Sequence, residues 1–349
     1  MTEQSPADLV SPLRVPSRAG VARAAAKIAA ILPPTPLLPL TIDGVTIWCK
    51  AEGLQPIGAF KIRGAWHRLT DLSDAERARG VVAFSSGNHA QGVAWAARRL
   101  GIAATIVMPA DAPQAKMQAT RDLGANVVTY DRRSESRENI AAALASESGA
   151  TVVPSFDDPW IVEGQGSLGI EAAAQLAAQT DGATFDHVVA CCGGGGLASG
   201  TVLALPGAAV TIVEPDGWDD MGLSLRGGAI VPVAPDAPDT LCDALQTPRV
   251  SPLTFDILRA HQAKAVSVSD TEAQAAMRLA FERLQLVLEP GGAVALAAVM
   301  TGKVAPGRHT LVTLSGGNVD AAVYLAMLAN APASFAAQDA MMSARYSSE

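Results

Sequence analysis

The sequence has few charged and few aromatic residues. Charged side chains make up 17% of the 349 residues and aromatic ones 4%, whereas hydrophobic residues reach 49%. This length and composition predict a compact protein with a large buried core and two subdomains, and they exclude a disordered chain. The formal net charge is −8 and no cluster of lysine and arginine occurs, so we expect no nucleic-acid surface.

Long apolar runs and a disulfide framework are also missing. No apolar stretch approaches the roughly 18 residues that span a bilayer, and the first 20 residues contain no apolar segment typical of a secretory signal. Two of the four cysteines, Cys191 and Cys192, are adjacent, which suits buried thiols. Neither C-x-x-C nor H-E-x-x-H occurs, so we expect no zinc site. The sequence therefore predicts a cytoplasmic protein that does not enter a membrane.

Short β-branched runs alternate with alanine-rich helical stretches from about residue 80 onwards. This alternation predicts an α/β fold, with parallel strands covered by helices on both faces. The predicted strands are residues 81–84, 104–108, 126–130, 151–154, 187–192, 209–213 and 309–314. The predicted helices include residues 91–100, 114–123, 137–148 and 168–178. The first 20 or so residues and the tail after about Ala331 lack a core pattern and are interpreted as arms.

A run of glycines follows the strand predicted at 187–192 and continues into a helix at Leu197. The run is Gly193, Gly194, Gly195 and Gly196. Such a turn brings several backbone N–H groups and a helix N-terminus close to a ligand, which is typical of a phosphate site; a tight turn alone would need only one or two glycines. Neither the P-loop pattern nor the glycine spacing of a dinucleotide site is present. However, Glu214 stands about 20 residues on, where a ribose-binding acid would lie, so a nicotinamide-dependent Rossmann enzyme remains the alternative.

Two more predicted strands end in polar, glycine-containing turns. Ser85-Ser86-Gly87-Asn88-His89 precedes a helix, and its small polar groups suit a carboxylate better than simple capping requires. Ser315-Gly316-Gly317-Asn318 follows the strand at 309–314, so the Ser315 hydroxyl is a candidate partner for a ring nitrogen. Because ligands of open α/β sheets bind at the carboxyl ends of strands, we expect the three turns to meet at one ligand.

A single lysine, Lys61, lies among apolar and small residues in the segment G-A-F-K-I-R-G-A. A lysine of this kind usually extends its charge to the surface. If the amine is desolvated, however, it loses its proton more readily and becomes a nucleophile or a general base.

Together, these four segments resemble the serine/threonine dehydratase and serine racemase family of fold-type II pyridoxal-phosphate enzymes. The matching segments are G-A-F-K-I-R-G-A, S-S-G-N-H, G-G-G-G-L and S-G-G-N-V-D, and the resemblance spans roughly residues 30–325. It implies a homodimer whose chains have two open, twisted parallel-sheet domains, similar to tryptophan synthase β. The implied domains are a large cofactor-binding domain (1–80 and 155–330), a small mobile domain (81–154) and a C-terminal tail (331–349).

The resemblance also implies roles for the matching residues around the cofactor. Lys61 holds pyridoxal phosphate as a Schiff base, Phe60 packs beside the pyridine ring, and Asn88 binds the ring hydroxyl. Ser315 faces the pyridine nitrogen. The remaining implied cofactor contacts are Gly193, Gly194, Gly195 and Gly196 at the phosphate, followed by Leu197 and Glu289.

Other implied residues contact the substrate. Ser85, Ser86, Gly87, Asn88 and His89 bind its carboxylate, and Ser86 lies on the face of the cofactor opposite Lys61. Ala244 stands near the substrate side chain, where relatives usually have glycine. Ala59 replaces the usual serine or threonine before Phe60, and the motif at Glu289 is also a variant.

Residues 213–220, V-E-P-D-G-W-D-D, resemble a divalent-cation site of several family members. The implied ligands are the Glu214 and Asp220 carboxylates and the Trp218 carbonyl, which suit Mg²⁺, Ca²⁺ or Mn²⁺. A solvated acidic turn is the alternative interpretation.

The implied activity is a pyridoxal-phosphate-dependent β-elimination. The enzyme would be an ammonia-lyase that converts a small β-hydroxy amino acid, such as L-threonine or L-serine, to a 2-oxo acid and ammonia. Because Ala244 changes the substrate pocket, the alternatives are 3-hydroxyaspartate or another catabolic β-hydroxy amino acid. An amino-acid racemase on the same scaffold is a further alternative.

Overall fold

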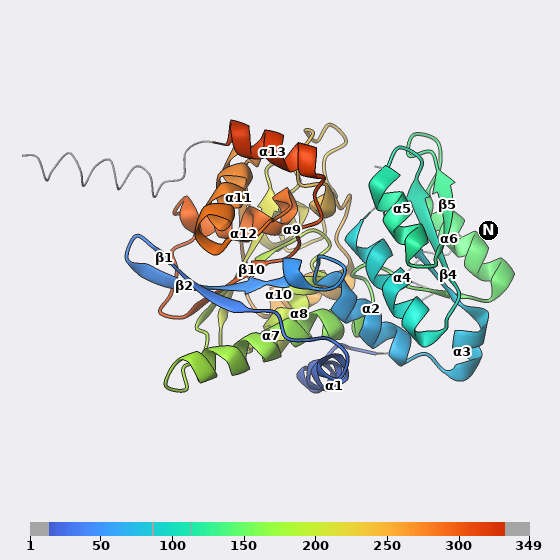
Figure 1. Ribbon diagram of the computed structural model, residues 1–349, viewed down its shortest axis with the longest axis horizontal. Helices are drawn as coiled ribbons and strands as arrows, with labels where there is room; N and C mark the ends of the chain where they lie inside the picture. The colour runs from blue at the N-terminus through green and yellow to red at the C-terminus, as the bar shows by residue number, and fades with distance from the viewer. Residues whose placement is uncertain (1–13, 86, 113, 332–349) are drawn as a thin grey trace, which may run out of the picture.

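The computed structural model describes residues 14–85, 87–112 and 114–331. Within these residues the strands form two sheets, one of six strands and one of four, on two sides of the molecule (Figure 1). The α/β fold expected from the sequence is confirmed. The described helices include none that is long and apolar enough to cross a membrane.

The larger sheet has the strand order β1-β2-β10-β7-β8-β9. Its strands are β1 (Leu37–Ile42), β2 (Val45–Ala51), β7 (His187–Cys191), β8 (Ala209–Pro215), β9 (Lys264–Val268) and β10 (Thr310–Leu314). All neighbours pair in parallel except β1 and β2, which form an antiparallel hairpin. Asp43 and Gly44 connect this hairpin with φ values of 47° and 78°, as a two-residue turn between twisted strands requires.

The smaller sheet has the order β5-β4-β3-β6, with all pairs parallel. Its strands are β3 (Val81–Phe84), β4 (Ala104–Pro109), β5 (Asn126–Tyr130) and β6 (Thr151–Val152). The helices between them are α4 (Asn88–Leu100), α5 (Gln114–Asp122) and α6 (Arg137–Ser148). The apolar core of this sheet continues into the helices that precede it in the chain, through residues such as Ile28 and Ile62.

Helices cover both faces of the larger sheet (Figure 1). Those on one face are α11 (Asp270–Leu284), α12 (Pro290–Met300) and α13 (Ala321–Asn330), whereas α9 (Asp220–Gly227) lies against β9 and the helix at Pro252–Ala260. Below the sheet in Figure 1 lie α1 (Arg18–Ala29), α7 (Pro159–Gln179), α8 (Gly196–Ala204) and α10 (Pro252–Ala260), while α2 (Lys61–Thr70) and α3 (Asp74–Arg79) lead to the smaller sheet. All of α12 is buried because its residues are apolar on every side.

The helix predicted at 168–178 is longer than expected. In the structure α7 begins at Pro159, after Asp158 caps its first turn by accepting from the Ile161 N–H at 3.0 Å. Glycines in the first half of α7 would be expected to interrupt a helix, but in the structure they allow neighbouring helices to pack closely against it. A Cβ on Gly164 would lie 2.5 Å from the Cα of Gly64 in α2, so only glycine allows these two helices to pack.

The described part of the N-terminal region is not an arm, which corrects the expectation for residues 14–20. Ser17 caps α1 by accepting from the Gly20 N–H, and Arg14 pairs with the buried Glu163 of α7. The remainder of both expected arms, residues 1–13 and 332–349, lies outside the described residues.

Candidate active site

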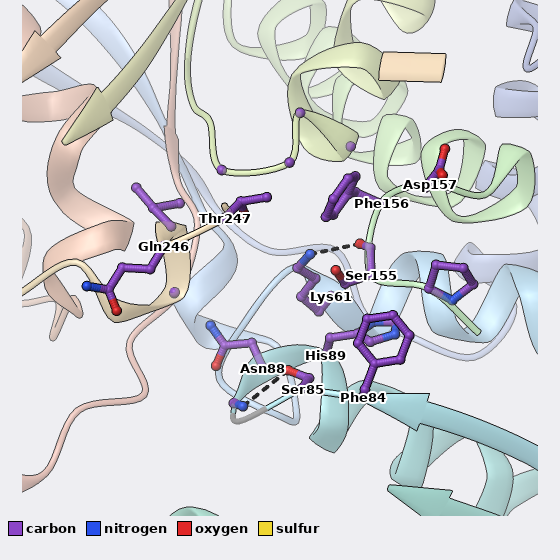
Figure 2. Close-up of a pocket in the computed structure, with 18 of the residues that line it drawn as sticks. Lys61, Phe84, Ser85, Asn88, His89, Ser155, Phe156, Asp157, Gln246 and Thr247 are labelled. Atoms are coloured by element: carbon purple, nitrogen blue, oxygen red, sulfur yellow. Dashed lines mark hydrogen bonds between the residues drawn. The ribbon is translucent and has the colours of Figure 1, made fainter. Parts of the chain in front are cut away.

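Lys61 is the first residue of α2 and faces a cavity of about 540 Å³. Its Nζ donates a hydrogen bond to the Ser155 carbonyl at 2.9 Å and lies 5.2 Å from the centre of the Phe60 ring. Burial lowers the pKa of Lys61 to about 8. A substantial fraction of this amine is therefore neutral near physiological pH. Figure 2 shows Lys61 in the middle of the cavity, between the turn bearing Asn88 and the loop bearing Phe156.

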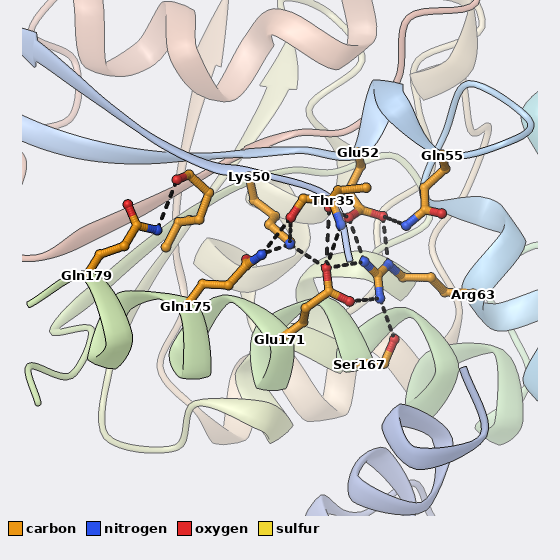
Figure 3. Close-up of polar contacts among 10 residues, drawn as sticks. Thr35, Lys50, Glu52, Gln55, Arg63, Ser167, Glu171, Gln175 and Gln179 are labelled. Atoms are coloured by element: carbon orange, nitrogen blue, oxygen red, sulfur yellow. Dashed lines mark hydrogen bonds and ion pairs between the residues drawn. The ribbon is translucent and has the colours of Figure 1, made fainter. Parts of the chain in front are cut away.

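A buried ion cluster fixes the helix that begins at Lys61 (Figure 3). Arg63 is 1% exposed and donates two hydrogen bonds to Glu52, of 2.7 and 2.8 Å, and two to Glu171, both of 3.0 Å. A fifth bond, to Ser167 Oγ at 3.2 Å, uses its last N–H group. Burial alone would lower the pKa of Arg63, but the two carboxylates raise it.

Lys50 completes this cluster from strand β2. Its fully buried ammonium donates to the Thr35 carbonyl at 2.6 Å, to Gln175 at 2.8 Å and to the Glu171 carboxylate. The cluster thus joins the larger sheet and α7 to the start of α2, and it balances two cations with two carboxylates. Because no buried charge in it lacks a partner, the cluster can hold Lys61 in one position.

The four glycines form the turn between β7 and α8. Gly195 is the N-cap of α8 with φ 84°, and no side chain caps this helix. Its first N–H groups are therefore open to an anion. A Cβ on Gly194 would lie 2.2 Å from Cδ1 of Phe156, and one on Gly196 would lie 3.0 Å from Cβ of Phe156. The turn is thus a backbone cradle with no room for side chains, which fits a phosphate group.

Four described residues of the second turn, Ser85, Gly87, Asn88 and His89, line the same cavity. The Gly87 N–H donates to Ser85 Oγ at 3.2 Å, and α4 begins at Asn88. The buried His89 bonds through Nε2 to the Val153 carbonyl at 2.8 Å. Burial, and secondarily the charge of Lys61, lowers the pKa of His89 to about 3, so its imidazole is neutral. Ser86 lies outside the described residues, and its place opposite Lys61 stays a prediction.

Asn88 is held from two sides. Its Nδ2 donates to Glu289 at 2.6 Å, and its Oδ1 accepts from Asn318 at 2.7 Å. Burial, followed by the charge of Asp243, raises the pKa of Glu289 to about 7. The amide of Asn88 is therefore kept in one orientation at the wall of the cavity.

Ser315 is buried where β10 ends, and it lines the cavity. Its carbonyl accepts from the Phe60 N–H at 3.1 Å, and its N–H donates to the Gly292 carbonyl at 3.3 Å. The segment before Lys61 is thus tied directly to the third predicted turn. Leu197, Glu289 and Ala244 also line this cavity, the last from a short 3-10 helix, η3 (Asp243–Leu245).

The residues expected to bind a cation, Glu214, Trp218 and Asp220, do not line this cavity. Glu214 is fully buried and accepts from the N–H groups of Met221 and Gly222, at 3.0 and 2.8 Å. Asp220 accepts from the Val250 N–H at 2.9 Å, and Trp218 donates through Nε1 to the Pro238 carbonyl at 2.7 Å.

Burial and the neighbouring charge of Asp220 raise the pKa of Glu214 well above the usual carboxyl value. Burial also raises the pKa of Asp220 to about 7. A cation would relieve this repulsion, so the residues fit one. The described residues contain no group of three or more His, Cys, Asp or Glu placed to hold a metal, and the site stays a prediction.

Sequence reasoning missed several residues that line the cavity. Ser155 contributes only its carbonyl, which leaves no signal in a sequence. Phe156 and Thr247 come from loops without a motif, and Lys116 comes from α5, far from any recognised turn. Asn318 was visible in the S-G-G-N segment but received no role.

The fold and the cavity define an α/β protein in which a buried amine lies near a glycine turn that fits a phosphate group. Residues 28–316 match the family described as "Pyridoxal-phosphate dependent enzyme". The chain belongs to this family, and its cofactor is pyridoxal phosphate. The nicotinamide alternative is wrong, because the family that matches the chain depends on pyridoxal phosphate.

The chain is similar to ammonia-lyases over most of its length. It is 43% identical to an L-threo-3-hydroxyaspartate ammonia-lyase of Pseudomonas sp., covering 82% of this chain and 88% of the relative. It is 39% identical to an L-threo-3-hydroxyaspartate ammonia-lyase of Saccharomyces cerevisiae, covering 82% and 86%. A solved threonine deaminase, from the organism abbreviated T.th., has a TM-score of 0.80 and 38% identity, covering 87% of this chain and 99% of that one. The expected fold type and the class, a pyridoxal-phosphate-dependent ammonia-lyase, are thereby confirmed.

Proposed function

We propose that this enzyme eliminates water from a small β-hydroxy amino acid and releases a 2-oxo acid and ammonia. The observation that carries the proposal is the Lys61 amine, which lines the same cavity as the glycine turn and whose pKa burial lowers to about 8. A base of this strength can accept and return a proton efficiently. The homodimer expected from the resemblance belongs to the same proposal.

The residues around the cavity fit pyridoxal phosphate. The amides of the glycine turn, residues 193–196, would hold its phosphate, Asn88 its ring hydroxyl and Ser315 its ring nitrogen. When bound, the cofactor supplies an electron sink for the charge that develops at the substrate α-carbon. The Ser315 hydroxyl is a neutral partner, which favours prompt loss of a β-substituent over transamination.

The protein residues would divide the remaining work. The backbone N–H groups of residues 85–89 bind the substrate carboxylate, with the positive end of α4 adding to the attraction. The Lys61 amine would take the α-proton of the substrate. Because His89 is neutral, its imidazole adds no positive charge here, and the carboxylate would depend on the backbone N–H groups.

L-threonine and L-serine are the substrates that the sequence led us to expect. A second candidate, 3-hydroxyaspartate, is favoured by the basic side chains that line the cavity. These are Lys116, Arg132, Arg137 and Arg249, in addition to Lys61. A second carboxylate on the substrate would match them, and both reported ammonia-lyase relatives bear the name of that substrate.

The test is a comparison of kcat/KM for L-threonine, L-serine and L-threo-3-hydroxyaspartate, measured as 2-oxo acid and ammonia formed. We expect turnover by the wild type and none by Lys61→Ala. Borohydride treatment of the holoenzyme should attach the cofactor covalently to the Lys61 peptide. Full activity of Lys61→Ala, or no turnover of any of these substrates, would contradict the proposal.

A further inference from the structure

One ion pair crosses the cavity from the smaller sheet to the larger one. Lys116 Nζ in α5 lies 2.5 Å from Asp243 Oδ2 in η3, and both residues line the cavity. Among the ion pairs of the described residues, only this one joins residues 81–154 to the rest of the chain. The two halves of the molecule are therefore in electrostatic contact at this point.

The pair acts on the inner wall of the cavity. Burial is the main cause that raises the pKa of Glu289; the charge of Asp243 raises it further, and the charge of Lys116 lowers it. Asp243 also precedes Ala244, whose Cβ is 3.6 Å from where a Cβ on Gly291 would lie, close to Glu289 in the chain. The Lys116 ammonium thus lies beside the part of the cavity that we expect to receive the substrate side chain.

Two other basic residues of the cavity have partners on their own side. Arg132 pairs with Asp111 at 2.7 Å, and Arg137 pairs with Glu138 at 2.8 Å. These four residues all belong to the smaller domain, so their pairs do not depend on the position of the larger one. Lys116 differs because its partner comes from η3, across the cavity.

The two members of the crossing pair differ in exposure. The Asp243 side chain is 49% exposed, whereas that of Lys116 is 20% exposed. Asp243 can therefore turn towards water at little cost, but Lys116 stays in the cavity and then needs another anion.

We propose that Lys116 is the specificity-determining residue for a second carboxylate, which replaces Asp243 as the partner of its ammonium. The preferred substrate class is then a β-hydroxy dicarboxylic amino acid. This inference rests on the proposed function and adds the group that selects the substrate. A neutral substrate leaves the Lys116–Asp243 pair intact and gains nothing from the lysine.

The test compares two substrates on holoenzyme variants. For Lys116→Gln, kcat/KM for L-threo-3-hydroxyaspartate divided by that for L-threonine should fall about 10- to 100-fold, because one charge-assisted hydrogen bond is lost. The loss should appear mainly in KM. Lys303→Gln is the matched control, because it removes one lysine from an ion pair with Glu272 outside this cavity, and its ratio should equal that of the wild type.

Asp243→Asn separates recognition from a purely structural bridge. If the pair only holds the domains together, Lys116→Gln and Asp243→Asn have the same effect on the ratio of the two kcat/KM values: both lower it, or neither changes it. If Lys116 recognises the carboxylate, Asp243→Asn removes a competitor and raises the ratio. Binding of L-aspartate, which has no β-hydroxyl to lose, should weaken in Lys116→Gln and tighten in Asp243→Asn, as followed by the cofactor absorbance.

The outcomes distinguish this inference from the proposed function. Equal losses for both substrates in Lys116→Gln, or a lowered or unchanged ratio in Asp243→Asn, would overturn the role of Lys116 while elimination activity remains. Failure of the wild type to convert any β-hydroxy amino acid would instead refute the proposed function. If Lys116→Gln does not fold, the direction of change in Asp243→Asn still decides.

Discussion

A methyl group at Gly194 should weaken cofactor binding. The added Cβ would lie 2.2 Å from Cδ1 and 2.3 Å from Cγ of Phe156. Carbon atoms in contact are about 3.5 Å apart, so the turn or the ring must move by roughly 1.3 Å. Substitutions that overfill a packed site cost about 1–3 kcal/mol. Because the same turn offers its N–H groups to the phosphate, Gly194→Ala should raise the Kd for pyridoxal phosphate about 5- to 150-fold.

The assay is a titration of the apoprotein with pyridoxal phosphate, followed by absorbance. Gly207→Ala is the matched control, because a Cβ there meets nothing within 4 Å. Circular dichroism of both variants separates weaker binding from unfolding. If folded Gly194→Ala binds the cofactor as tightly as the wild type, the glycine turn is not the phosphate cradle and our interpretation of it is wrong.

Two further predictions concern residues around the site. Arg63→Lys keeps the charge but loses the paired bonds to two carboxylates. It should therefore destabilise the protein by about 3 kcal/mol and shift the pH titration of the Lys61–cofactor linkage. Arg68→Lys, on the same helix, is the control and should leave that titration unchanged. Mg²⁺, Ca²⁺ or Mn²⁺ should raise Tm, and Glu214→Gln should abolish the effect. The raised carboxyl pKa values make the cation-free fold less stable as pH rises. The increase in Tm caused by the cation should therefore grow through about pH 7, where Asp220 loses its proton. The same increase in Glu214→Gln as in the wild type would contradict the cation site.

Local patterns were sufficient to predict the elements that carry the recognised motifs. The strand at 81–84 and the helix at 137–148 agree with β3 and α6 in every residue, and the three polar turns contribute to the lining of one cavity. These elements could be predicted because strand ends, glycines and capping residues act within a few positions of the chain.

The hairpin of β1 and β2 was missed although its Asp-Gly turn was visible. Pro39 argues against a strand, because it has no N–H to donate. The structure resolves the conflict by placing β1 at the edge of the sheet, where one side of the strand has no neighbour to receive a bond. Whether a segment with Pro39 can form a strand therefore depends on its position in the sheet, and that position is set by tertiary structure.

Contacts between distant segments left no local signal. Arg63 and Glu171 are 108 residues apart, and Lys116 and Asp243 are 127 apart. Neither pair could be inferred from one sequence, because each partner alone looks like an ordinary surface charge. The motifs located the amine of Lys61, whereas the groups that hold it, and the pair that we propose to select the substrate, become visible only in the fold.

The residues around Lys61 and the pair Lys116–Asp243 differ in how they carry charge in the cavity. Around Lys61, burial favours the neutral forms of the ionisable side chains. It lowers the pKa of Lys61 and of His89, and it raises the pKa of Cys191 and Glu289. The proton transfer that we propose for Lys61 would take place in this buried region, where a charge formed by the reaction has the largest effect. At the side-chain end, Lys116 and Asp243 keep opposite charges in contact across the cavity. Separate regions of one cavity are therefore suited to chemistry and to selection, so a change in substrate preference need not alter the reaction.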